Sequence, residues 1–329
     1  MPAHAVISQY HGTMTIRFGV LFLFLFGLIG FAEARPAPKM KALAKTLKPD
    51  SAWVERKLAR MGFSKGFIKE AVASYEPESF EKTLTLNLLG FLRAPGQHMN
   101  LVTPQSVRES TQFILKNKTT FEQTEMKYDV PANVIAALLW IETRHGEDVG
   151  TFHTASVYLH LLQADLSANK KVLAKLALEK NKEERNYTPK ALRKLMGERT
   201  KKKALWAEEQ LIALAAARKE KHLNLKELRG SYAGAFGLPQ FIPSSYRSFA
   251  QTLEPQSTPD LDTIEDAIVS VGYYLSKHGW KNQEEESKVT ALMKYNNSRD
   301  YADSILEISR RVLDVSPSTK KSRAVSSSE

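Results

Sequence analysis

Residues 132–146 read ANVIAALLWIETRHG, and this stretch decides the fold class. The segment from Ala136 to Ile141 is apolar on every side of a helix, which is typical of a buried helix and not of a surface one. Pro131 precedes the stretch and Gly146 ends it, as expected for the start and the stop of a helix. We therefore predict a buried helix that ends close to Glu142.

Helical periodicity continues on both sides of this stretch. Residues 103–130 open with Thr103 as the N-cap and Pro104 in the first turn, which is a favourable helix start. We expect further helices at residues 153–165, 188–221, 263–278 and 299–313, and we find no convincing hairpin signal. The sequence therefore predicts an all-α protein.

The first residues have the pattern of an export signal. Arg17 precedes an apolar run from Phe18 to Phe31, and small residues follow at Ala32 and Ala34. This order indicates a secretory signal peptide that is cleaved after Ala34, giving a periplasmic protein. A membrane anchor is the alternative, but the run is shorter than the roughly 20 residues that a bilayer needs. Met14 lies just before the pattern and is an alternative start.

The composition of the chain excludes several kinds of chemistry and indicates the charge of a partner. The chain has no cysteine, which excludes disulfides, thiol catalysis and thiolate metal sites. Its formal net charge is +11, and a basic balance favours an anionic partner. Outside the cytoplasm such a partner belongs to the cell envelope and not to nucleic acid, although simple solubility would explain the charge equally well.

We predict four segments along the chain. Residues 1–34 are the signal peptide, residues 35–49 a linker, residues 50–313 one long helical region, and residues 314–329 a disordered tail. Within the helical region, residues 166–226 form a Lys-rich helical insertion. Such charge runs are usually solvated helix faces, and a basic patch that grips an anionic polymer is the alternative.

Glu142 is the candidate catalytic residue. A carboxylate in the last turn of a buried helix opposes the helix dipole and is partly desolvated, and both effects raise its pKa. A general acid that works near neutral pH needs such a pKa. The alternative is that Glu142 only pairs with Arg144 or with a distant lysine.

A second stretch, GSYAGAFGLPQFIPSSYRSFA at residues 230–250, combines glycines, aromatic rings and one glutamine. Its glycines let the backbone approach another group closely. Tyr232 and Phe236 offer flat apolar faces, and Gln240 offers a hydrogen-bond donor and an acceptor. Rings with amide hydrogen bonds are suited to holding sugars, whereas a glycine-rich turn inside a core is the alternative.

The blocks IETRHG, GSYAGAFGLPQFIPSSY, DAIVSVGYYLSKHGW and KYNNSRDYA occur in the order that is seen in lytic murein transglycosylases. The chain resembles family B of these enzymes, the membrane-bound-B type of the SLT and lysozyme-like superfamily. The resemblance covers roughly residues 49–313, and the second block is highly specific. It implies an all-α, lysozyme-like transglycosylase domain with additional helical lobes.

The resemblance also implies an activity and its residues. Lytic transglycosylases cleave the β-1,4 bond between N-acetylmuramic acid and N-acetylglucosamine and leave 1,6-anhydromuramyl ends. Matching the motifs implies Glu142 as the catalytic acid and the following groove residues as substrate-binding: Ser231, Tyr232, Gln240, Tyr274, Tyr295 and Asn296. Leu238 and Pro239 depart from the family, which more often has an aromatic residue and a glycine there.

Two other function classes stay open. A hydrolase that acts on murein or chitin would need a second groove carboxylate about 5–9 Å from the acid. Asp262, Glu265 and Asp266 are the candidates, although the matched motifs supply only Glu142. The other class is a non-catalytic protein that binds peptidoglycan.

We expect no metal and no cofactor. His145, His153 and His160 lack a carboxylate or a fourth ligand at a suitable spacing for zinc. Residues 247–266 lack the alternating Asp and Asn and the glycine of an EF-hand calcium loop. The expected partners are peptidoglycan glycan strands, with no nucleic acid, with peripheral envelope association as an option, and with a monomeric chain.

Overall fold

The computed structural model describes residues 38–92, 97–220, 223–254 and 257–315. Over these residues the all-α prediction is confirmed, because nearly every regular element is a helix. Two short strands, β1 (Phe152–His153) and β2 (Arg229–Gly230), pair antiparallel with Phe152 opposite Gly230. The predicted signal peptide at residues 1–34 and almost all of the predicted tail at 314–329 lie outside the described residues.

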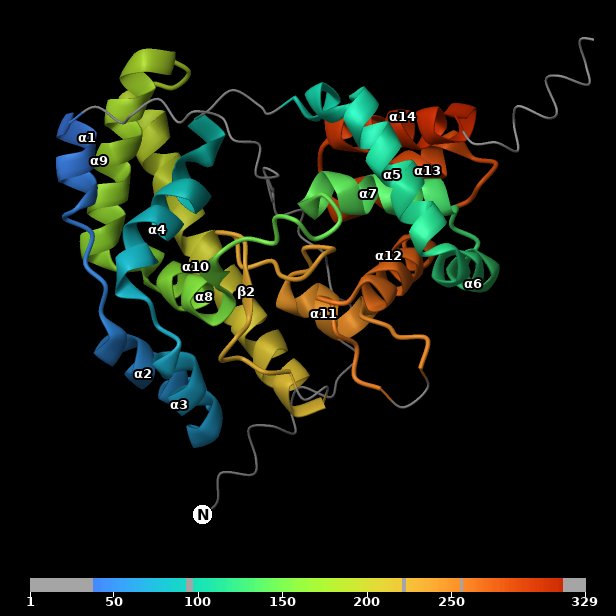
Figure 1. Cartoon of the computed structure of the whole chain (residues 1–329). Coiled ribbons are helices and arrows are strands. Elements are labelled where there is room, and N and C mark those ends of the chain that lie inside the picture. Colours follow the sequence, from blue (N-terminus) through green and yellow to red (C-terminus); the bar gives the residue numbers. More distant parts are fainter. Residues whose placement is uncertain (1–37, 93–96, 221–222, 255–256, 316–329) are drawn as a thin grey trace, which may run out of the picture.

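The helices form two groups that lie side by side (Figure 1). The group that we call the α10 lobe contains α1 (Pro38–Ala44), α2 (Ser51–Arg60), α3 (Lys65–Ala73), α4 (Phe80–Leu89), α8 (Thr154–Leu162), α9 (Ser167–Glu184) and α10 (Pro189–Glu220). The α7 lobe contains α5 (Pro104–Lys116), α6 (Lys118–Tyr128), α7 (Ala132–Thr143), α12 (Ile264–Lys277), α13 (Glu285–Tyr295) and α14 (Arg299–Val315). Helix α11 (Pro243–Phe249) packs on both α10 and α12 and so joins the two lobes.

Short 3-10 segments complete the connections. They are η2 (Pro77–Ser79), η3 (Gly90–Leu92), η4 (His98–Leu101) and η5 (Gln163–Asp165). The segment expected to be helical over residues 103–130 is divided at Asn117 into α5 and α6. The helices predicted at 153–165, 188–221, 263–278 and 299–313 correspond to α8, α10, α12 and α14.

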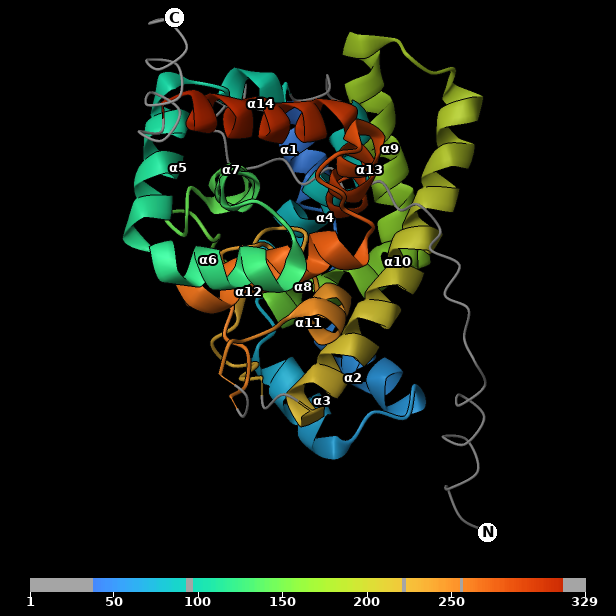
Figure 2. The same cartoon turned by 90° about the vertical axis from the view of Figure 1, so that its right-hand side faces the viewer.

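Helix α7 is the centre of its lobe. Every residue from Asn133 to Thr143 is buried, as the all-round apolar sequence predicts. Figure 2 looks along α7 and shows α14 and α6 on opposite sides of it, with α5 beside them. The Asn133 side chain donates to the Ser309 carbonyl at 3.1 Å and contacts the Ser309 hydroxyl at 2.6 Å. These bonds tie the start of α7 to the far end of α14.

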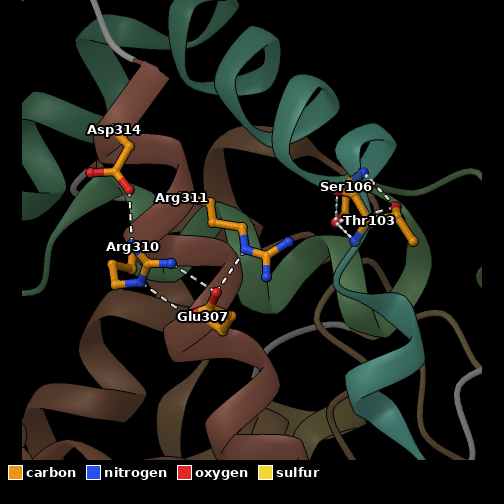
Figure 3. A network of polar contacts seen from close by, with 6 residues as sticks. All are labelled: Thr103, Ser106, Glu307, Arg310, Arg311 and Asp314. Atoms are coloured by element: carbon orange, nitrogen blue, oxygen red, sulfur yellow. Dashed lines mark hydrogen bonds and ion pairs between the residues drawn. The ribbon is translucent and has the colours of Figure 1, made fainter.

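Polar contacts also define the outer ends of α5 and α14 (Figure 3). Thr103 caps α5, since its hydroxyl accepts from the Ser106 backbone while the Ser106 hydroxyl accepts from the Thr103 backbone. On α14, hydrogen bonds from Arg310 and Arg311 lower the pKa of Glu307 to about 2. Exposed ion pairs of this kind contribute about 0–1 kcal/mol each, so packing on α7 does most to hold the two helices.

The linker expected at residues 35–49 is corrected by the structure. Residues 38–44 form α1, which packs on α9. Ala44 and Leu47 are buried in the core, and the Lys48 backbone N–H donates to the Asn169 side chain at 3.0 Å. The Lys- and Pro-rich composition hid an apolar face at helical spacing. Residues 35–37 lie outside the described part of the chain.

The Lys-rich segment at 166–226 forms the hairpin of α9 and α10. Leu173, Leu176, Leu192 and Met196 are buried, whereas most lysines of the hairpin are exposed or half-buried. The charge run is therefore mainly the solvated face of two amphipathic helices, which is the ordinary interpretation of such a sequence.

Candidate active site

Glu142 lies one residue before the end of α7, and only 8% of its surface is exposed. Burial raises its pKa from the ordinary 4.5 to about 7, because the charged form is costly away from water. The Tyr301 hydroxyl donates a hydrogen bond of 2.5 Å to Oε1 of Glu142, which lowers the pKa and offsets part of this effect. The carboxyl group can thus be a proton donor at neutral pH and a stabilised acceptor afterwards.

The chain reverses directly after this acid. Arg144, His145 and Gly146 all have positive φ, at 50°, 59° and 100°. The Arg144 and His145 backbone N–H groups donate to carbonyls of the last turn, at 2.9 and 3.2 Å, and so cap the helix end. The Arg144 guanidinium lies over the Trp140 ring at 5.6 Å, and the structure shows no pairing between Arg144 and Glu142.

The glycine-rich segment is fastened to the end of α7. The Thr143 hydroxyl, next to Glu142, donates to the Leu238 carbonyl at 2.8 Å. Isolated bridges pair Gly230 with Phe236 and Phe236 with Phe241, so the segment folds back on itself as an irregular wall.

The glycines of this segment are required by close contacts inside the protein. A Cβ at Gly230 would lie 1.9 Å from the Ala235 carbonyl oxygen, and a Cβ at Gly234 would lie 2.5 Å from the Tyr158 ring. Gly234 also has a φ of 82°, which side chains rarely adopt. The sequence correctly indicated close backbone approach, but the group approached is the protein itself.

Gln240 is buried and has a positive φ of 51°. Its side-chain nitrogen donates to the Val149 and Gly237 carbonyls, each at 3.0 Å. These bonds hold the loop after α7 against the glycine-rich segment. The amide nitrogen therefore helps to shape the wall, which is a positioning role, whereas the motif predicted a contact to the sugar.

Three tyrosines form an aromatic cluster beside Glu142. The ring of Tyr295 lies 4.7 Å from that of Tyr274 and 6.5 Å from that of Tyr301. The Tyr274 hydroxyl donates to the Lys294 carbonyl at 2.7 Å, and the Tyr295 hydroxyl donates to the Pro239 carbonyl. Burial raises the pKa of each of the three hydroxyls, so all are neutral at physiological pH.

The structure brings most of the sequence-predicted residues to this place. Glu142, Gln240, Tyr274 and Tyr295 are connected through the contacts above, and Asn296 is buried at the end of α13. Ser231 and Tyr232 lie at the start of the same wall. There the Tyr232 carbonyl accepts from Asn87 of α4 at 2.8 Å, and the Tyr232 ring lies 6.5 Å from Phe152.

Sequence reasoning missed Tyr301, the residue that bonds to Glu142. The signal was present, because Tyr301 lies inside the block KYNNSRDYA that was used for the resemblance. It follows the Tyr295-Asn296 pair by less than two helical turns. A tyrosine in the first turns of a helix carries no distinctive pattern, however, and only the packing of α14 on α7 shows its partner.

The three histidines considered for zinc have separate partners. A ring nitrogen of each is hydrogen-bonded: His145 to the Ala136 carbonyl, His153 to the Lys226 carbonyl, and His160 to the Ser156 hydroxyl. Burial lowers the pKa of His145 to about 4 and that of His160 to about 3. Within the described part of the chain, no group of three or more side chains of metal-ligand type comes together. The described helices are also too short or too polar to cross a bilayer.

Comparison with known structures gives the fold its class. Lytic transglycosylase Slt35 of Escherichia coli, solved with calcium, aligns with a TM-score of 0.58 at 17% identity, over 80% of this chain and 93% of that one. Soluble lytic transglycosylase SltB1 of Pseudomonas aeruginosa also has a TM-score of 0.58, at 18% identity, over 80% and 98% of the two chains. The fold is therefore that of the lytic transglycosylases.

Sequence comparison gives the family. The model of the Transglycosylase SLT domain matches residues 47–290, so this chain belongs to that family. Membrane-bound lytic murein transglycosylase B of E. coli strain K12 is 29% identical over 179 residues. The matched region makes up 54% of this chain and 40% of that relative, so less than half of the relative is covered.

The raised pKa of Glu142 makes a prediction about stability. Its folded pKa of about 7 lies above the unfolded value near 4.5, so the folded state holds a proton that the unfolded state releases between these values. The wild type therefore loses stability as pH rises through this window, by about 3 kcal/mol at about 1.4 kcal/mol per pKa unit. Glu142→Gln has no ionisable group at this position and should not lose stability in this way. In urea unfolding at several pH values, its free energy of unfolding relative to that of the wild type should therefore rise from pH 4 to pH 8.

Glu109→Gln is the matched control. Burial would raise the pKa of Glu109, but hydrogen bonds from Trp140 and Gln105 outweigh it and lower that pKa. Its stabilising effect is present above the unfolded pKa of 4.5 and is lost as the pH falls below that value, so the stability of this variant relative to the wild type should stay nearly constant from about pH 5 to about pH 8. Stability curves of the wild type and Glu142→Gln that stay parallel across pH 4–8 would contradict the burial of an ionisable Glu142.

The bonds of Gln240 predict a cost of removing its side chain. Gln240→Ala leaves the Val149 and Gly237 carbonyls without this donor, so the free energy of unfolding should fall by about 1–3 kcal/mol. Gln251→Ala is the control, because within the described residues that amide nitrogen donates only to the adjacent Ala250 carbonyl. Denaturant midpoints that are equal for both variants would show that the Gln240 amide does not hold the wall.

Proposed function

We propose that this protein is an exported lytic transglycosylase that cleaves the bond between N-acetylmuramic acid and N-acetylglucosamine in peptidoglycan. Membership of the Transglycosylase SLT domain family supports the class of reaction. The observation that carries the proposal is the buried carboxyl group of Glu142, whose pKa is raised to about 7 and whose hydrogen-bond partner is the Tyr301 hydroxyl.

One carboxyl group is enough for the proposed reaction. Protonated Glu142 donates to the glycosidic oxygen, and that bond breaks. The resulting carboxylate takes the proton from the C6 hydroxyl of the muramyl residue, and the C6 oxygen closes on C1 to form the 1,6-anhydro ring. Glu142 ends protonated, as it began, so no water and no cofactor is consumed. A pKa near the working pH suits a group that must both give and take a proton.

The surroundings of Glu142 favour this reaction over hydrolysis. Among the described residues, burial and the Tyr301 bond are the two influences on its pKa, and no second carboxylate acts on it. The three candidates for that role lie at the start of α12. Asp266 accepts from the Asp260 backbone at 2.8 Å, and Asp262 and Glu265 are exposed. A two-carboxylate hydrolase needs its second group close to the acid.

The wall and the aromatic cluster supply the proposed glycan contacts. Tyr232 is half-buried, and Ser231, Asn296 and Gln240 are buried polar residues of the wall and of the end of α13. The Tyr274 and Tyr295 hydroxyls donate to the backbone, which leaves their oxygens as acceptors toward the substrate. We assign no metal or cofactor to this chemistry. In crystals of Pseudomonas aeruginosa SltB3, a relative at 15% identity, NAG-NAM-pentapeptide is bound.

The products of murein digestion test the reaction. The purified mature protein should release 1,6-anhydromuramyl products from murein sacculi, as seen by mass spectrometry. Glu142→Gln should lower the rate by at least the roughly 10²–10⁴-fold that general acid-base catalysis contributes. Glu147→Gln, which removes an exposed carboxylate just after α7, should retain full activity.

Each rival class has its own outcome. Reducing-end products from the wild type would identify a hydrolase. Binding to sacculi without any release of fragments would identify a non-catalytic peptidoglycan-binding protein. Wild-type rates for Glu142→Gln would remove Glu142 from the mechanism.

Export is part of the proposal, because peptidoglycan lies outside the cytoplasm. The run from Phe18 to Ala34 predicts cleavage after Ala34 and a soluble periplasmic product. N-terminal sequencing of protein released from the periplasm should begin at Arg35. Recovery of the chain in the membrane fraction with Phe18 to Phe31 retained would contradict it.

A further inference from the structure

His98 opens the short segment η4 and packs against the start of α14. Its backbone N–H donates to Oδ2 of Asp300, and its ring nitrogen Nδ1 lies 3.2 Å from the same oxygen. Only 8% of His98 is exposed. The Asp300 carboxylate therefore fixes both the backbone and the ring plane of His98, although the two residues are 202 positions apart in sequence.

The His98 ring packs against Tyr301, the residue whose hydroxyl donates to Glu142. The rings of His98 and Tyr301 are 5.5 Å apart and almost perpendicular, at 89°. An edge-to-face contact of this kind has a preferred geometry and limits how the Tyr301 ring can turn. The hydroxyl of that ring donates to Oε1 of Glu142. A continuous series of contacts thus runs from Asp300 through His98 and Tyr301 to the acid.

We propose that His98, oriented by Asp300, is a positioning residue of the active site that holds the Tyr301 ring so that its hydroxyl reaches Glu142. The inference rests on the proposed function only in taking Glu142 as the acid. His98 does not touch the acid, so its effect is transmitted by Tyr301. Asp300 lies in the first turn of α14, where the helix dipole favours a carboxylate, so the anchor is itself stable.

The contacts from Asp300 through His98 and Tyr301 to Glu142 predict a change in the pKa of Glu142, which a merely structural role of His98 would not produce. The Tyr301 bond lowers the pKa of Glu142, so loosening Tyr301 should raise that pKa further. The other polar groups around α7 are engaged elsewhere. Tyr295 of α13 donates to Pro239, Tyr274 of α12 donates to Lys294, and Glu109 of α5 accepts from Trp140. We therefore expect a shift caused by His98 to pass through Tyr301.

The test is an NMR titration of the Glu142 side-chain carboxyl in the whole mature protein, without substrate. The signal is assigned as the one that disappears in Glu142→Gln. We expect His98→Ala to raise the titration midpoint in the same direction as Tyr301→Phe. Adding His98→Ala to Tyr301→Phe should cause no further shift, because the bond through which His98 acts is already absent.

Two further variants separate the contacts of His98. His98→Asn retains an amide N–H in reach of Asp300 but lacks the ring, and it serves if His98→Ala fails to fold. His98→Asn should also raise the titration midpoint of Glu142, because the edge-to-face contact with the Tyr301 ring is lost. Asp303→Asn is the matched control, because it breaks the exposed pair with Arg299 on the same end of α14 and should leave the midpoint unchanged.

Kinetics on murein fragments supply a second measurement. His98→Ala should lower kcat several-fold and leave KM unchanged, and the alkaline limb of its pH profile should move to higher pH. An unshifted Glu142 midpoint in both His98 variants, or an equal shift with and without Tyr301→Phe, would overturn the proposal. The titration needs no turnover, so a shifted midpoint in a protein that does not cut murein would refute the proposed function and not the positioning role.

Discussion

The hydrogen bond from Tyr301 to a buried Glu142 is the interaction on which the rest of the site depends. A carboxyl group at the end of an apolar helix is useful only if it can lose its proton without a prohibitive cost. One short bond from a neutral hydroxyl supplies that help without bringing a charge near. The bond requires α14 to lie along α7, and the contact of Asn133 with Ser309 holds the other end of the same helix pair.

The wall beside Glu142 is likewise held in place by a small number of contacts. Its tight backbone is held by internal approaches at Gly230 and Gly234 and by the amide of Gln240. Thr143 connects it to the residue next to the acid. The distance between the acid and the wall is therefore fixed by covalent neighbours and short hydrogen bonds. This rigidity suits the proposed reaction, in which a substrate hydroxyl must close on its own ring.

Local sequence patterns predicted what depends on local physics. The apolar run before Glu142 indicated a buried helix end, and burial is what raises the pKa of this acid. The partner of the acid could not be predicted in this way, because Tyr301 lies 159 positions away and only tertiary packing brings it close. Gln240 was predicted as a contact to the sugar, and its bonds to the backbone could not be predicted, because they follow from a left-handed conformation that no sequence pattern shows. The linker prediction at residues 35–49 overlooked α1, because lysines obscured its apolar spacing.

The order of the elements along the chain has a consequence for when the site exists. Glu142 is made before the midpoint of the chain, whereas its hydroxyl partner belongs to α14, the last described helix. A chain that is still emerging from the ribosome therefore has an acid without its partner and a wall without its aromatic neighbours. The site is thus assembled only after α14 has been made, and a chain cut off before α14 would leave the carboxyl group of Glu142 without this hydrogen bond.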